Sequence, residues 1–164
     1  MTKETKIFRI IICSLLTLTI IWSVFLGVVL LPDCFRERAI DEKYDLWITN
    51  VRVTSDNAED VLGDGTVHYD AYDNILTFEN ALIESEHTII YSVNDLNVRL
   101  IGENKFICKN ESTNFGIYAG DSYIHKDLAI YGDGSLTIEM TTKSKEATGI
   151  FADDLMVNSD ITII

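Results

Sequence analysis

The chain is poor in proline and cysteine, and both shortages limit what it can be. Its 164 residues include one proline and three cysteines. Pro32 precedes every strand-like segment, which fits an array of paired strands, because proline cannot donate to a strand ladder. Cys13 lies in a long apolar segment, Cys34 follows it, and Cys108 occupies a repeated strand position that is expected to face the core. The cysteines therefore predict no disulfide framework.

Basic residues are also scarce, and the formal net charge is -13. Residues 32–164 carry 25 of the 26 acidic residues and ten of the 13 basic ones, which gives this part a net charge of about −15. Such a surface repels nucleic acid and anionic lipid and attracts cations. It also repels acidic polysaccharides unless a divalent ion bridges the two. Solubility alone is an alternative explanation of the charge.

Catalytic patterns are missing as well. His68, His87 and His125 occupy non-equivalent positions, and none has a cysteine or serine partner at a recognisable spacing. The zinc-binding patterns His-Glu-x-x-His and Cys-x-x-Cys do not occur. The adjacent carboxylates Asp153 and Asp154 are explained more simply by a turn than by a hydrolase pair. The sequence therefore predicts a protein that is not an enzyme.

One long apolar run is present near the N-terminus. Residues 10–31 contain no charged residue and would span about 33 Å as a helix, enough to cross a bilayer. Lys3, Lys6 and Arg9 precede the run, so residues 1–9 are expected in the cytoplasm and the rest outside the cell. Residues 32–43 then form a linker. The alternative is a long signal peptide that is cleaved.

Short strand patterns recur in the second half, at spacings of 27 to 33 residues. One pattern starts at Asp95, Asp127 and Asp154, each followed by Leu, and a second contains Tyr91, Tyr118 and Phe151, each preceded by Ile. Recurring short strands predict a solenoid in which each repeat packs on its neighbours. Three strands per repeat predict a three-sided parallel β-helix over residues 81–164. Residues 44–80 are expected to cap it, with a short helix at 54–63 and a hairpin of 66–70 with 74–79.

The last predicted coil stops after Ile161-Thr162-Ile163-Ile164, without a polar cap. An apolar strand at an open end invites association. The sequence therefore indicates either a truncated product, which we favour, or end-to-end self-association.

The repeats predict two outward-facing ladders. Tyr91, Tyr118 and Phe151 each follow an inward isoleucine and form an aromatic ladder that can stack against the sugar rings of a glycan. The alternative is an aromatic ladder that only stabilises the sheet.

The second ladder consists of Asp95, Asp127 and Asp154, with Asp121 and Asp153 close in sequence. Stacked carboxylates repel one another, and a calcium ion bound by several of them would remove the repulsion. The alternative is that each aspartate forms a turn and stays solvated.

The stretch from Tyr44-Asp45-Leu46-Trp47-Ile48 through Val53–Val67 to Asn74-Ile75-Leu76-Thr77 resembles the opening of one bacterial family. It comprises clostridial surface proteins described as carbohydrate-binding-domain proteins with a right-handed parallel β-helix fold. The Gly-Ile-Tyr-Ala and Asp-Leu-x-Ile repeats are similar to that family too. The resemblance implies a surface protein that binds plant-type polysaccharides and calcium, without established catalysis.

Together these observations predict a membrane-anchored extracellular protein that binds polysaccharide, with calcium as its ion. Two other functions remain open: a polysaccharide lyase or hydrolase, and a structural or adhesin-like spacer without a ligand.

Overall fold

The computed structural model describes residues 42–109, 115–121, 123–141 and 147–164. The chain divides into two units after Ile40, and the predicted membrane span at 10–31 lies outside the described residues. Within the described ranges, no helix is long and apolar enough to cross a membrane.

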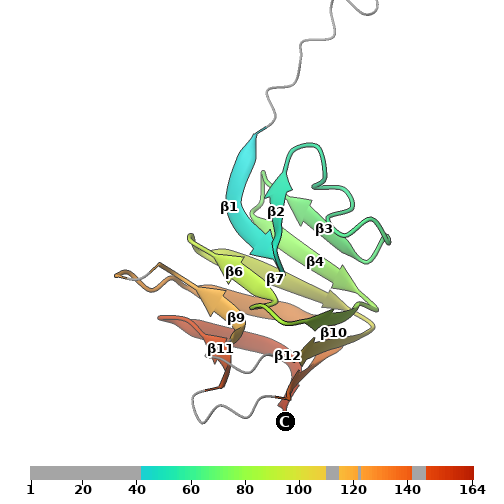
Figure 1. Cartoon of the computed structure of the whole chain (residues 1–164), viewed down its shortest axis with the longest axis vertical. Helices are drawn as coiled ribbons and strands as arrows, with labels where there is room; N and C mark the ends of the chain where they lie inside the picture. Colours follow the sequence, from blue (N-terminus) through green and yellow to red (C-terminus); the bar gives the residue numbers. More distant parts are fainter. Residues whose placement is uncertain (1–41, 110–114, 122, 142–146) are drawn as a thin grey trace, which may run out of the picture. The chain divides into compact units, whose positions relative to one another are not determined.

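The described part of the second unit is all-β (Figure 1). Its strands are β1 (Lys43–Ile48), β2 (Val51–Thr54), β3 (Val67–Asp70), β4 (Ile75–Glu79), β5 (Leu82–Ser85), β6 (Ile90–Ser92), β7 (Leu96–Ile101), β8 (Glu103–Cys108), β9 (Phe115–Ala119), β10 (Leu128–Met140), β11 (Thr148–Phe151) and β12 (Leu155–Ile163). One sheet has the order β11-β9-β6-β1-β2. The other has the order β3-β4-β7-β10-β8-β5, with β12 paired to β10.

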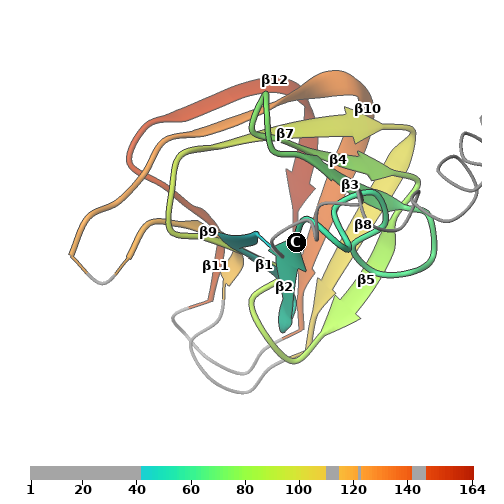
Figure 2. The same ribbon diagram turned by 90° about the horizontal axis from the view of Figure 1, so that it is seen from above.

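The predicted right-handed parallel β-helix is wrong, although the all-β class is correct. The strands form two mixed sheets and not three parallel ones. The pairs β1–β2, β1–β6 and β3–β4 are antiparallel, whereas β7, β8 and β12 all pair with β10 in parallel. The larger sheet curls around the core as a half-barrel (Figure 2).

Strand β10 continues without a break through Gly132-Asp133-Gly134, where it passes from its pairing with β7 to its pairing with β8. Gly132 has a φ of 127°, and a Cβ atom there would lie 2.2 Å from the Leu100 carbonyl oxygen. A Cβ atom on Gly134 would lie 2.6 Å from the carbonyl oxygen of Gly102. Glycine thus lets the strand bend while the neighbouring backbone stays close. Residues 128–140 therefore form one strand of 13 residues.

The short helix predicted at 54–63 is also absent from the structure, where these residues end β2 and form turns. Asp60 Oδ1 accepts the backbone N–H groups of Gly63, Asp64 and Gly65 at 2.9, 3.1 and 3.0 Å. One carboxylate thus satisfies the donors of the loop, a local alternative to helix formation. The hairpin expected next is confirmed as the antiparallel β3–β4 pair.

A single apolar core fills the space between the sheets. Its largest fully buried side chains are Phe78, Phe106, Ile48, Leu76, Ile89, Ile90, Leu100, Ile117, Leu128, Ile130, Leu136 and Ile138. Asn104 is buried among them, and its amide satisfies backbone groups at the bend, accepting the Ala81 N–H at 2.9 Å and donating to the Ser135 carbonyl at 3.2 Å.

Candidate functional site

The outer face of the five-stranded sheet carries a continuous row of side chains, one from each strand. Trp47 pairs with Arg52 on β2 and with Tyr91 on β6. Tyr91 pairs with Tyr118 on β9, which in turn pairs with Phe151 on β11. Strands β1, β6, β9 and β11 follow one another in this order in Figure 1. We call Trp47, Tyr91, Tyr118 and Phe151 the aromatic row.

Neighbouring rings of the aromatic row are in contact. The ring centroids of Trp47 and Tyr91 are 5.3 Å apart, those of Tyr91 and Tyr118 are 5.7 Å apart, and those of Tyr118 and Phe151 are 5.1 Å apart. All four side chains are half-buried. The rings therefore support one another and still present part of their surface to solvent.

Both ends of the row are extended by other side chains. At one end the Arg52 guanidinium lies 4.9 Å from the centre of the Trp47 ring and pairs with Asp45 at 2.7 Å. At the other end Phe115 and His125 contact the Phe151 ring, with centroids 5.4 and 4.7 Å away.

A shallow hollow of about 420 Å³ opens beside the first two rings. It is lined by Trp47, Thr49, Asn50, His87, Thr88 and Tyr91. Within the described ranges, the side chains of His87 and Thr88 form no hydrogen bond, so they are available to a ligand. Thr49 has a φ of 59°, a region that β-branched residues rarely adopt. Such strain is found preferentially at binding sites.

The environment of the row favours the uncharged phenol of Tyr91. Burial raises the pKa of Tyr91, and the neighbouring Tyr118, Asp121 and Asp45 add to the effect. The Tyr118 hydroxyl donates to the Asp121 carbonyl oxygen at 2.9 Å. At neutral pH Tyr91 therefore offers a hydroxyl group and not a phenolate at the edge of the row.

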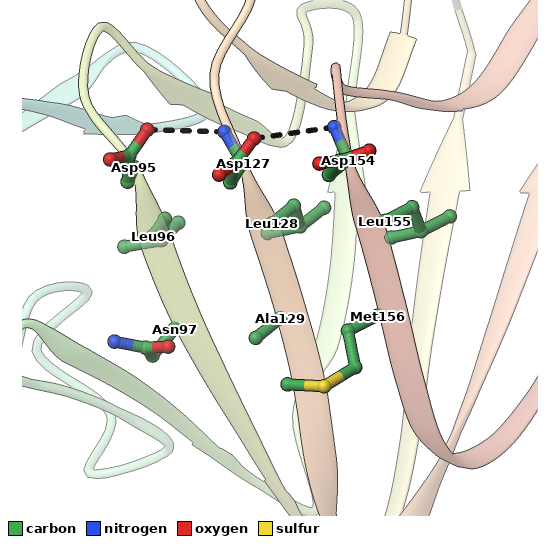
Figure 3. A pocket seen from close by; sticks show the side chains of 9 residues that line it. All are labelled: Asp95, Leu96, Asn97, Asp127, Leu128, Ala129, Asp154, Leu155 and Met156. Carbon is green, nitrogen blue, oxygen red and sulfur yellow. Dashed lines mark hydrogen bonds between the residues drawn. The ribbon is translucent and has the colours of Figure 1, made fainter.

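The aspartate ladder lies at the start of β7, β10 and β12 (Figure 3). Asp95 Oδ1 accepts the Asp127 backbone N–H at 3.1 Å, and Asp127 Oδ1 accepts the Asp154 N–H at 3.3 Å. The three residues line a cavity of about 400 Å³ together with Leu96, Asn97, Leu128, Ala129, Leu155 and Met156. In each of the first two aspartates, one carboxylate oxygen is thus engaged in holding the next strand.

The other two predicted metal ligands have different surroundings. Asp121 Oδ1 accepts the N–H groups of Tyr123 and Ile124, both at 2.7 Å, and these bonds hold the pKa of Asp121 below its usual value. Asp153 is exposed, and its backbone N–H donates to the Lys126 carbonyl at 3.0 Å. Among the residues that the structure describes, no group of three or more His, Cys, Asp or Glu side chains is arranged to hold a metal ion. Calcium binding remains a prediction.

Sequence reasoning missed Trp47, Arg52, Phe115 and His125 as members of the site. The signal for Trp47 is a reversed dipeptide: Trp47-Ile48 has the order ring then isoleucine, whereas Ile90-Tyr91 and Ile117-Tyr118 have the opposite order. Strand β1 is antiparallel to β6, so the same pair of facing positions appears in the opposite sequence order on β1.

Comparisons with protein-family models, with curated proteins and with solved structures found no match to this chain. The resemblance to clostridial carbohydrate-binding-domain proteins therefore remains a prediction, and the function must be argued from the geometry alone.

Proposed function

We propose that the chain is a non-catalytic protein of the outer cell surface that binds a neutral polysaccharide along the aromatic row. The observation that carries this proposal is the register of four rings across four strands, at centroid spacings of 5.1 to 5.7 Å, beside a hollow lined by His87 and Thr88, whose side chains form no hydrogen bond within the described ranges. An extended line of rings suits an extended ligand.

The chemistry of the row suits a sugar chain. A pyranose ring has an apolar face, which packs on an aromatic ring, and a polar edge, which needs hydrogen-bond partners. The hollow supplies both, because two of its walls are Trp47 and Tyr91 and its other walls are His87, Thr88 and the pair Thr49–Asn50. Stabilisation of the sheet also explains the stacking, but it does not require the hollow.

The charge of the protein favours a neutral ligand over an acidic one. The formal net charge is -13, and Asp45 neutralises Arg52 at the end of the row. An acidic polysaccharide would be repelled at low ionic strength. Binding of pectin that depends on added calcium would instead support an ion-bridged mode.

The test is affinity electrophoresis or calorimetry of the full chain in detergent against soluble neutral glucans and mannans, with polygalacturonate as the acidic comparison. Tyr91→Ala and Tyr118→Ala should each weaken binding by about two- to tenfold, since one aromatic contact contributes about 0.5–1.5 kcal/mol. Tyr72→Ala is the matched control, because Tyr72 is 96% exposed on the β3–β4 turn.

Each result has a distinct meaning. Undiminished binding by the Tyr91 and Tyr118 variants would contradict the role of the row. Release of reducing ends or unsaturated products would identify a hydrolase or lyase. Absence of binding to any polysaccharide would leave the rings a structural role, as in a spacer.

The cellular location belongs to the same proposal, with residues 10–31 as the anchor. Protease added to intact cells should remove an epitope tag at the C-terminus, and protection of that tag would contradict an extracellular domain. A tag before residue 10 should survive unless the membrane is permeabilised.

A further inference from the structure

Strand β12 leaves one edge without a partner in the described part of the chain, since it pairs only with β10. Its residues Leu155, Val157, Ile161 and Ile163 are in register with the buried Leu128, Ile130, Leu136 and Ile138. Yet Leu155, Val157 and Ile163 are 47%, 45% and 50% exposed. An unpaired strand edge with exposed apolar side chains is a template for pairing with another chain.

The hydrogen bonds show which backbone groups of β12 are free. The Asp154 carbonyl accepts the Leu128 N–H at 2.9 Å, and the Ile164 N–H donates to the Ile138 carbonyl at 3.0 Å. In a parallel pair, alternate residues bond to the neighbouring strand. The N–H and C=O groups of Leu155, Val157, Ile161 and Ile163 therefore point to the free edge. The residues with free backbone groups are the same ones that carry the apolar side chains.

We propose that this edge pairs with β12 of a second copy of the chain, antiparallel, about a two-fold axis at Ser159. In this register Leu155 lies opposite Ile163 and Val157 lies opposite Ile161, on the core side of both copies. The sequence of β12 is thus complementary to itself, as an isologous dimer interface requires. Each such pair exchanges two backbone hydrogen bonds.

Charge selects the same register. With Ser159 on the axis, Asp160 lies opposite Asn158, a pair without repulsion. A shift that places Asp160 on the axis sets the two Asp160 side chains against each other, which is unfavourable for directly opposed residues. A shift that places Asn158 on the axis sets Val157 opposite Ser159 and Ile163 opposite Asp153, so neither apolar side chain faces another. An unrelated strand has no reason to match this symmetry, so the second copy is the occupant that fits.

The proposal is independent of polysaccharide binding and is tested on the full chain in detergent by size-exclusion chromatography with light scattering. The protein mass should rise with concentration from 18.5 kDa to about twice that value. Because each copy carries a net charge of -13, added salt should strengthen the dimer.

Two opposite charge changes test the register. Asn158→Asp places two carboxylates opposite each other twice per dimer and should weaken it roughly three- to tenfold, whereas Asn158→Lys should strengthen it by a similar factor. Tyr72→Asp and Tyr72→Lys change the net charge equally on the exposed β3–β4 turn and should have much smaller effects.

Two further variants guard against a folding artefact. Val157→Pro removes an N–H at the free edge, which an edge strand tolerates, and should give a folded monomer. Ser159→Cys should form a disulfide-linked dimer beyond that of the parent chain, whereas Thr162→Cys should not, because the two copies of residue 162 would be about 20 Å apart. A monomer at all concentrations, a dimer that survives Val157→Pro, or equal cross-linking at 159 and 162 would each overturn the proposal.

Discussion

Tyr118 and Phe151 are stacked, with ring centroids 5.1 Å apart and ring planes within 9° of parallel. They lie in register on β9 and β11. The residues that precede them, Ile117 and Ile150, are paired in the same register. The aromatic row is therefore held in place before any ligand arrives, which lowers the entropic cost of binding.

The stack itself should be measurable. Tyr118→Ala and Phe151→Ala should each destabilise the fold, and the double variant should lose less than the sum by about 0.5–1.5 kcal/mol, the contribution of an aromatic pair. Urea unfolding of the four proteins gives this coupling energy. Tyr118→Phe is the control, because it keeps the ring and removes only the bond to the Asp121 carbonyl. Additive losses would mean that the rings do not interact.

The bend of β10 depends on Gly132. Gly132→Ala combines a positive φ with a contact of 2.2 Å between the new Cβ and the Leu100 carbonyl oxygen, so we expect a loss of at least about 3 kcal/mol. Gly63→Ala is the matched control: its φ is 78°, but no atom lies within 4 Å of the new Cβ, and the loss should be about 1–2 kcal/mol. Equal losses in thermal unfolding would show that the close approach is not needed.

A substitution in the aspartate ladder can distinguish a structural role of the carboxylates from calcium binding. Asp127→Asn keeps an acceptor oxygen for the Asp154 N–H and removes the charge. If calcium binds the ladder, the ion should raise the melting temperature of the parent chain and not that of this variant. Calorimetric titration measures the same difference. If neither protein responds, the carboxylates serve only to hold the next strand, and relief of like-charge repulsion should leave the variant at least as stable.

The lowered pKa of Asp121, in the turn after β9, predicts how the stability of the fold changes in acid. Its pKa is lowered by the N–H groups of Tyr123 and Ile124, so the carboxylate is stabilised in the folded state. The stabilisation is present above the ordinary pKa of aspartate, near pH 4, and is lost as the pH falls through the lower folded value. Urea unfolding between pH 5 and pH 2 should therefore show a smaller acid-induced loss for Asp121→Asn than for the parent. An identical pH profile would contradict this assignment.

Repeat alignment predicts much of the strand register. The alignment of Leu96, Leu128 and Leu155 agrees with the β7–β10–β12 pairing, and that of Tyr91, Tyr118 and Phe151 agrees with β6–β9–β11. These patterns are local and alternate with period two, so the sequence directly indicates which residues are paired on neighbouring strands.

The remaining features depend on contacts between distant segments. Cys108 pairs with Met140 and Leu96 pairs with Leu128, so one register with a separation of 32 residues continues through the β10 bend. The sheets are mixed because β1 is antiparallel to β2 and β6, and β3 is antiparallel to β4. The bend depends on the close approach of Leu100 and Gly102 to two glycines, which strand periodicity does not encode.

The place of Trp47 at one end of the aromatic row gives the protein a built-in optical probe. The chain has two tryptophans, Trp22 in the predicted anchor and Trp47, so Trp47 is the sole indole in residues 41–164. Its ring sits between the Arg52 guanidinium and Tyr91, and it forms a wall of the hollow. In a Trp22→Phe background, its emission would report both the assembly of the five-stranded sheet and the arrival of a ligand, without any added dye.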